Sequence, residues 1–100
     1  MRVIALSTLK RFWEGKGGHA DAREPLLAGY RELAKADWSG PADVKRQFGK
    51  ASILRDGRVV FDIAGNKYRL VVHINYPYRV VYIRFIDTHA DYDAIDVHTI

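Results

Sequence analysis

The second half of the chain alternates apolar and polar residues with a period of two, which is the pattern of half-buried β-strands. The pattern predicts strands over residues 51–55, 58–63, 67–75 and 79–86. The dipeptide Asp56-Gly57 suits a tight type I′ hairpin turn, and further turns are expected at residues 64–66 and 76–78. Because each connection is short, we expect these strands to form an antiparallel meander.

Before residue 50 the apolar positions recur at helical spacing instead. After a short strand at residues 2–6, Ser7 is placed to cap a first helix, which the glycine-rich residues 15–18 end. A second helix is expected from about residue 19 or 21 to 36, with Pro25 in its first turn, and a third over residues 41–48. The predicted fold is α+β. A single domain, residues 1–100, packs two to three N-terminal helices on one face of a small antiparallel sheet.

The alternation also assigns side chains to the two faces of the sheet. Those expected to point at the helices are Tyr68, Leu70, Val72 and Ile74, and those expected on the opposite face are Lys67, Arg69, Val71 and His73. In the last strand the same rule puts Arg84 on one face with Val80, Tyr82 and Ile86. A cation in such apolar company is costly to bury without a partner, so Arg84 is a candidate functional residue.

The basic residues are concentrated where the sheet is expected. The formal net charge is +4, but residues 45–84 hold nine Lys and Arg against two Asp, whereas residues 85–100 hold four Asp and no Lys or Arg. A clustered basic surface is expected of a protein that binds a phosphate backbone, although an acidic protein partner fits the same charge. The segment Thr88-His-Ala-Asp-Tyr-Asp93 adds a histidine, a tyrosine and carboxylates, and Thr88 is placed to cap a last helical turn.

Composition excludes several classes of function. The chain has no cysteine, which rules out disulfides, thiolate zinc sites and a cysteine nucleophile. The four histidines lack the local spacing of a metal site, so we expect no metal or other cofactor. No apolar stretch approaches the roughly 20 residues that span a bilayer, and charged residues near the N-terminus argue against a signal peptide. The expectation is a cytoplasmic protein without membrane contact.

The residues on the predicted sheet suit cleavage of RNA by its own 2′-hydroxyl. That reaction requires a base for the 2′ proton, cations for the charged phosphorane and an acid for the leaving 5′ oxygen, and it requires no metal. The candidate catalytic residues are Arg69, Arg84, His89 and Tyr92, and the candidate RNA-binding residues are Lys50, Arg55, Lys67, His73 and Asp93. Guanidinium groups match phosphate oxygens, imidazole exchanges protons near neutral pH, and tyrosine stacks on bases. Each residue taken singly has a plain structural alternative, so the prediction depends on their lying together.

Several blocks of the sequence resemble the HigB-type toxins of bacterial type II toxin–antitoxin systems. They are residues 60–72, 82–86 and 88–93, preceded by shorter matches at residues 1–4, 12–14, 36–38 and 41–45. The blocks occur in order at matching spacing over nearly the whole chain. The resemblance implies a RelE-like fold and an mRNA interferase that cleaves mRNA, usually on translating ribosomes, without a metal.

The resemblance also implies a partner, a HigA-type antitoxin with a helix-turn-helix domain, and contact with DNA only through that complex. By position it favours Arg69, Arg84 and His89, with Lys67, Tyr92 and Asp93 behind them. Whether His89 is an acid, a base or a structural residue stays open. So do two other functions, a non-catalytic module that binds RNA or the ribosome and a protein-interaction domain whose basic sheet receives an acidic partner.

Overall fold

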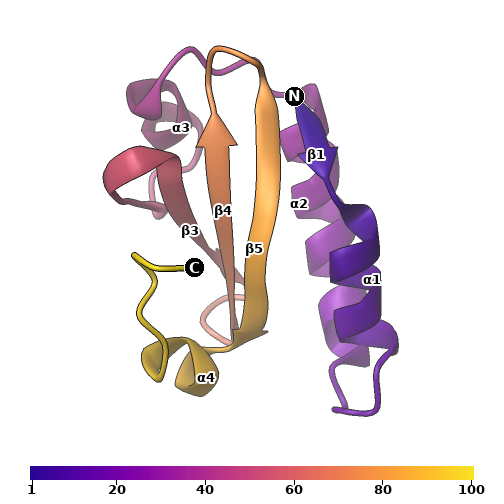
Figure 1. Ribbon diagram of the computed structural model, residues 1–100. Helices are drawn as coiled ribbons and strands as arrows, with labels where there is room; N and C mark the ends of the chain where they lie inside the picture. Colours follow the sequence, from indigo (N-terminus) through magenta and orange to yellow (C-terminus); the bar gives the residue numbers. More distant parts are fainter.

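The computed structural model describes residues 1–100 and shows a five-stranded sheet with helices packed beside it (Figure 1). The strands are β1 (Arg2–Ile4), β2 (Ser52–Ile53), β3 (Arg58–Ile63), β4 (Tyr68–Asn75) and β5 (Val80–Thr88), in the spatial order β1-β5-β4-β3-β2. The helices are α1 (Leu6–Glu14), α2 (Arg23–Lys35), α3 (Pro41–Gln47) and α4 (His89–Asp93), with single 3₁₀ turns at Ala20–Ala22 and Arg55–Gly57. The predicted α+β class is confirmed, with helices first and a meander after them.

The sheet is mixed rather than wholly antiparallel. Strands β2 to β5 form the predicted antiparallel meander, but β1 lies parallel to β5, with Val3 opposite Val81. A parallel neighbour needs a long crossover, which the intervening helices and strands supply here. Apolar alternation carries no information on strand direction, so the pattern alone did not distinguish the two arrangements at β1.

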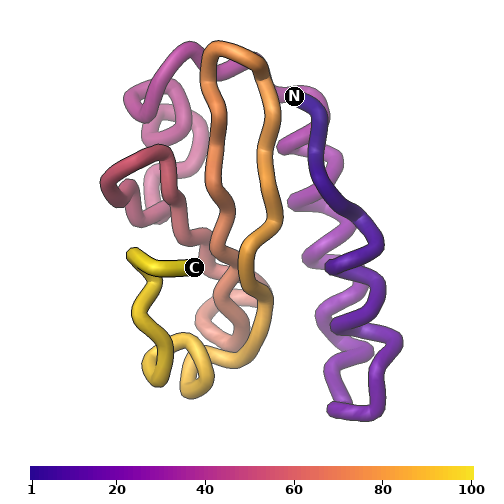
Figure 2. Tube along the Cα trace, in the orientation of Figure 1, coloured from indigo at the N-terminus to yellow at the C-terminus, as the bar shows by residue number.

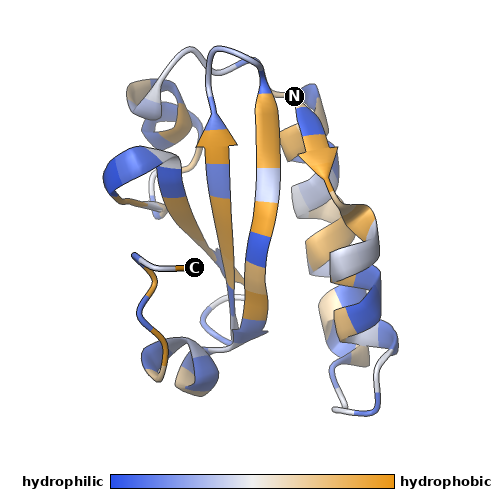
Figure 3. Ribbon diagram, in the orientation of Figure 1, coloured by the Kyte–Doolittle hydropathy of each residue, from blue (hydrophilic) through white to orange (hydrophobic).

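The core lies between the helices and one face of the sheet. In Figure 3 strands β4 and β5 are mostly apolar and carry isolated polar positions. Tyr68, Leu70, Val72 and Ile74 are all buried in this core, which confirms the predicted inward face of β4. From the helices, the core receives buried side chains that include Leu9, Trp13, Leu26, Leu33 and Val44.

The helix boundaries differ from the prediction at the N-terminus of α1. This helix begins at Leu6, so Ala5 occupies the N-cap, no side chain caps it, and Ser7 lies inside the first turn. Leu6 packs against the core, and that contact starts the helix one residue before the polar cap that the sequence offers. Pro25 does lie in the first turn of α2, as predicted. None of the helices is both long and apolar enough to cross a membrane.

A β-bulge in β5 changes which residues share a face. Phe85 pairs with Val71 and Ile83 with Val72, so Arg84 is an extra residue without a partner on β4. Beyond an inserted residue the alternation of faces resumes out of phase. Ile86 therefore lies opposite Leu70 and packs against the core, and the prediction that it shares a face with Arg84 is wrong.

The face of the sheet opposite the helices is only partly open. The trace in Figure 2 shows the chain after α4 running back beside β3, and the Arg58 Nε donates a hydrogen bond of 3.1 Å to the Ile100 carbonyl. Val60 and Val71 point to this outer face and are nevertheless buried. The outer face thus has a covered half near α4 and an exposed half near the β4–β5 hairpin.

Candidate active site

The exposed half of the outer face contains a hollow of about 430 Å³. Its walls come from the β2–β3 turn, the β4–β5 hairpin and the adjoining parts of both strands, and its lining residues are Asp56, Gly57, His73, Ile74, Asn75, Tyr76, Pro77, Tyr82 and Arg84. His73 on β4 and Tyr82 on β5 are paired across the strands. The hollow therefore brings together an imidazole, a phenol and a guanidinium, three groups that suit a phosphodiester substrate.

Arg84 stands over the Tyr82 ring, with its guanidinium carbon 5.1 Å from the ring centre. Arg69 and Arg79, the other arginines of the β4–β5 hairpin, are ion-paired to Asp62 and Asp37, whereas Arg84 has no acidic partner. The ring orients the guanidinium by a cation–π contact without neutralising its charge. Such an exposed planar cation is ready to bind phosphate oxygens through two hydrogen bonds.

The predicted Asp56-Gly57 turn is confirmed and forms one wall of the hollow. Both residues have positive φ, 59° for Asp56 and 79° for Gly57, as a type I′ turn requires. A Cβ on Gly57 would lie 2.5 Å from the Ile74 carbonyl oxygen and 3.2 Å from the His73 ring. Only glycine allows this approach, so the turn presses directly against β4 beside His73.

A second group of predicted residues lies at the other end of β5. Thr88 caps α4 as predicted, because its Oγ1 accepts a hydrogen bond of 3.2 Å from the Asp91 N–H. The His89 Nδ1 lies 2.9 Å from the Asp93 Oδ2, and both side chains are about half exposed. The Tyr92 ring centre lies 6.4 Å from that of Phe85. We call His89, Tyr92 and Asp93 the α4 cluster.

The hollow and the α4 cluster are separate. The His89 N–H bonds the Lys67 carbonyl at one end of β4, whereas His73 lies six residues further along. At about 3.3 Å per residue, this separation is roughly 20 Å. Arg84 makes a cation–π contact with Tyr82 and lines the hollow together with His73. The structure thus brings Arg84 together with His73 and not with His89.

Arg69 makes its contacts within the protein. Its side chain is 10% exposed, with Nε 3.2 Å from the Asp62 Oδ1 on the neighbouring strand. Its Nη2 also donates a hydrogen bond of 2.5 Å to the Asn66 Oδ1 in the β3–β4 turn. These bonds tie the turn to both strands. That Arg69 acts on RNA stays a prediction.

Lys67 is engaged on the helix side of the sheet, so the prediction that it points to the opposite face is wrong. It forms an ion pair with Asp21, whose other carboxylate oxygen accepts a hydrogen bond of 2.5 Å from the Tyr68 hydroxyl. Hydrogen bonds from Lys67 and then Tyr68 lower the pKa of Asp21, and the bond to Asp21 raises the pKa of Lys67. Burial, followed by the bond to Asp21, raises the pKa of Tyr68. This network joins the 3₁₀ turn before α2 to the start of β4.

The remaining predicted RNA-binding residues are exposed at the β2 side of the sheet. Lys50 lines a shallow hollow beside Phe48 and Gly65, and Arg55 begins the turn that leads to Gly57. Neither is ion-paired, so both leave positive charge on the surface that borders the β2–β3 hairpin. Their contact with RNA stays a prediction.

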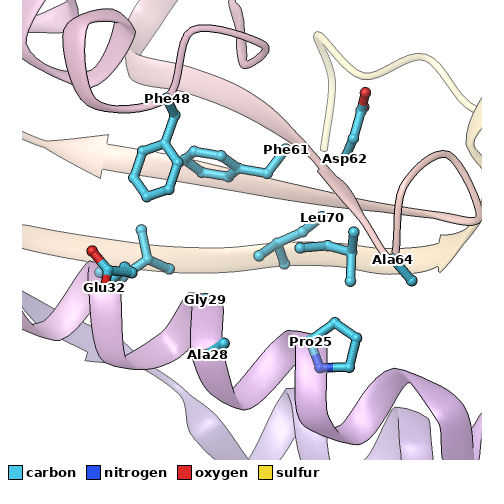
Figure 4. Close-up of a pocket in the computed structure, with 11 residues that line it drawn as sticks. Pro25, Ala28, Gly29, Glu32, Phe48, Phe61, Asp62, Ala64 and Leu70 are labelled. Atoms are coloured by element: carbon cyan, nitrogen blue, oxygen red, sulfur yellow. The ribbon is translucent and has the colours of Figure 1, made fainter.

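An apolar groove of about 310 Å³ lies between α2 and the sheet (Figure 4). Pro25, Ala28 and Gly29 form its helix side, and Phe61 and Leu70 lie across from them. Its ionisable lining residues are Glu32 and Asp62, and Asp62 is paired with Arg69 on the outer face. The groove thus lacks an acid–base pair and a free cation, so it is a poor candidate for the reaction.

Sequence reasoning did not assign Tyr82 to the site. The signal was available, because a turn over residues 76–79 pairs Asn75 with Val80 and therefore His73 with Tyr82. The bulge that leaves Arg84 without a partner on β4 had no counterpart in the sequence pattern, since apolar residues flank Arg84 on both sides.

Comparison with known proteins adds two findings. The model of the HigB_toxin family, described as the RelE-like toxic component of a toxin–antitoxin system, matches residues 22–95. The chain is also similar to a protein named mRNA interferase HigB from Escherichia coli O6:H1, with 28% identity over 68 residues. That match covers 66% of this chain and 66% of the relative. The family match includes every residue of the hollow and of the α4 cluster.

Proposed function

This chain belongs to the family of HigB toxins, the RelE-like toxic components of toxin–antitoxin systems, and we propose that it is an mRNA interferase. In this proposal it cleaves mRNA by attack of the 2′-hydroxyl on the adjacent phosphodiester, without a metal. The activity named for the Escherichia coli relative supports the substrate and the type of reaction.

The observation that carries the proposal is the hollow with its unpaired cation. The phosphorane formed by 2′-hydroxyl attack carries extra negative charge, and a positioned guanidinium stabilises that charge. Arg84 is exposed, oriented by Tyr82 and free of an acidic partner. His73 lines the same hollow and belongs to the residue type that most often transfers protons in enzymes.

The α4 cluster is proposed to contact RNA at the other end of the same strands. That His89, Tyr92 and Arg69 take part in catalysis itself, beside Arg84, stays a prediction from the sequence. Tyr92 is partly exposed and offers a ring on which an unpaired base can stack. Asp93 holds the His89 imidazole from one side, at 2.9 Å.

We further propose that cleavage takes place on translating ribosomes and that a HigA-type antitoxin with a helix-turn-helix domain inhibits it. The positive net charge of residues 45–84 supports action on the ribosome, because a basic surface associates with the phosphate backbone of ribosomal RNA. The family's description as a toxic component supports inhibition by an antitoxin, since such a component requires an inhibitor. Operator DNA would be contacted through the antitoxin.

The test is controlled expression in a bacterial host with mapping of mRNA 5′ ends after induction. We expect growth arrest and new mRNA ends with the wild type, and their loss with Arg84→Ala and His89→Ala. Arg31→Ala serves as the charge-matched control, because Arg31 is exposed on α2 away from the outer face. Soluble wild-type protein that leaves growth and RNA ends unchanged would disprove the proposal.

A purified assay separates the alternatives. Addition of EDTA at a concentration that leaves ribosomes intact should leave cleavage unchanged, and omission of ribosomes should reduce it. A binding module without catalysis would instead associate with RNA in a salt-dependent manner and produce no new ends. A domain that only receives an acidic protein would show no RNA affinity at physiological salt.

A further inference from the structure

We propose that the phosphodiester to be cleaved lies in the hollow between Arg84 and His73, and that His73 is the base that accepts the 2′-hydroxyl proton. This inference rests on the proposed RNA-cleaving function and deepens it. It assigns the reaction to one place on the outer face and names a base that neither the sequence pattern nor the family resemblance singles out.

The position of Arg84 determines where a bound phosphate lies. The guanidinium of Arg84 is fixed over Tyr82 at 5.1 Å, so a phosphate that it binds lies beside that ring. Tyr82 and His73 are paired across β4 and β5, and the Cβ atoms of such a pair are about 5 Å apart. A phosphate bound to Arg84 therefore lies close to the His73 ring.

His89 lies too far from His73 to act on the same phosphodiester. The 2′ oxygen attacks the same phosphorus atom that the 5′ oxygen leaves, so both proton transfers take place beside one phosphodiester. His73 on β4 and His89 at the start of α4 are separated by roughly 20 Å and cannot both act there. Since Arg84 lies with His73, the α4 cluster then contacts a more distant part of the RNA while His73 acts at the reacting nucleotide.

The β2–β3 turn and the neighbouring strands position His73. The Cβ position of Gly57 lies 3.2 Å from the imidazole, so the β2–β3 turn supports the ring from one side. The charged and titratable groups that face His73 are Arg58 across β3, Tyr82 and Arg84 on β5, and Asp56 in the turn. A volume of about 430 Å³ lies within the range of small-ligand sites, and it gives room for about one nucleotide.

His73 takes the proton from the 2′-hydroxyl, the 2′ oxygen forms a bond to phosphorus, and the bond between phosphorus and the 5′ oxygen breaks. The 5′ oxygen takes a proton from solvent, to which the hollow is open, and His73 returns its proton to solvent. The products are a 2′,3′-cyclic phosphate and a 5′-hydroxyl. Arg84 stabilises the charge on the phosphorane oxygens throughout.

The experiment compares mRNA cleavage on translating ribosomes by the purified wild type, His73→Ala and His73→Gln. We expect both variants to lose about 100- to 10,000-fold in kcat, the range found for a removed acid–base group. Added imidazole should restore part of the activity of His73→Ala but not of His73→Gln, because only the alanine leaves space for it. His98→Ala is the histidine control, since that exposed side chain lines no hollow.

Two further measurements distinguish a base from a structural residue at position 73. The acidic limb of the pH–rate profile should disappear in His73→Gln, whereas a structural role for the imidazole would leave its shape unchanged. The same chain with an RNA that carries a 2′-deoxy group at the cleaved position should show an NMR shift of the His73 ring on binding. Wild-type rates in His73→Ala, or no rescue together with an unchanged profile, would overturn the assignment. An inactive wild type would instead overturn the RNA-cleaving function itself.

Discussion

Arg84 and Tyr82 lie on one face of β5, with the guanidinium carbon 5.1 Å from the centre of the ring. A bulge inserts Arg84 between two paired residues and leaves it without a partner on β4. A bulge re-aims a side chain and increases the local twist of the strand. Here it produces an oriented and uncompensated cation at the edge of a polar hollow.

Replacement of Arg84 should affect RNA binding much more than folding. Arg84→Ala should lower RNA affinity and reduce the slope of log K against log salt by about one, since one phosphate contact is lost. Arg84→Lys should retain the slope but lose cleavage, because lysine keeps the charge without the planar fork. Titration of RNA at several salt concentrations measures both effects. The free energy of unfolding should change by less than about 0.5 kcal/mol, because Arg84 is exposed. An unaltered salt slope in Arg84→Ala would show that no phosphate is bound there.

The variant Gly57→Ala should destabilise the protein strongly. Its Cβ would lie 2.5 Å from the Ile74 carbonyl oxygen, and the φ of 79° is unfavourable for alanine. We expect a loss of roughly 2 kcal/mol or more in the free energy of unfolding, measured by urea denaturation. Gly29→Ala is the control, because nothing lies within 4 Å of its Cβ position in α2. That change should stabilise the helix by up to about 1 kcal/mol.

Arg69 is expected to matter for stability whether or not it touches RNA. Arg69→Met removes a 10%-exposed guanidinium and leaves the Asp62 carboxylate and the Asn66 side chain without their partner. The free energy of unfolding should fall by roughly 1–3 kcal/mol. A double-mutant cycle with Asp62→Asn should give a coupling of about 0.5 kcal/mol or more between the two side chains. Additive effects in that cycle would mean that the ion pair contributes nothing.

The Asp21 network predicts a pH dependence of folding stability. Because the pKa of Asp21 is lowered below its usual 3.8, its contribution is fully present above that value and is lost as pH falls through the folded pKa. The pKa values of Lys67 and Tyr68 are raised above 10.5 and 10.0, so their contributions are lost as pH rises through the folded values.

The difference in Tm between the wild type and Asp21→Asn should therefore be constant from about pH 5 to pH 9 and should shrink outside that range. Thermal unfolding across the pH range measures it. The comparison variant is Glu14→Gln, whose exposed carboxylate has no ion-pair partner. Since Lys67 and Asp21 are about half exposed, added salt should reduce the difference at every pH.

Much of the fold was predictable because its signals are local. The period-two pattern identified the inward face of β4. The dipeptide Asp56-Gly57 identified a turn with two positive φ values, which few residue pairs adopt without strain. The cap at Thr88 was also predictable, because a threonine before a short polar helix satisfies a free N–H. Ser7 offered the same chemistry and was not used, since the packing of Leu6 determined the start of α1.

The site was predictable in its residue types and not in its grouping. The sequence by itself determined an α+β domain with basic residues concentrated on its sheet and with Arg84, His73 and His89 as candidate functional residues, because alternation and charge are properties of neighbouring residues. Only the tertiary structure decided that Arg84 and Tyr82 lie with His73, that His89 lies roughly 20 Å away, and that Arg69 is paired with Asp62. Those outcomes depend on strand register, on one bulge and on cross-strand ion pairs. Each of these is set by contacts between residues distant in the chain, which no local pattern encodes.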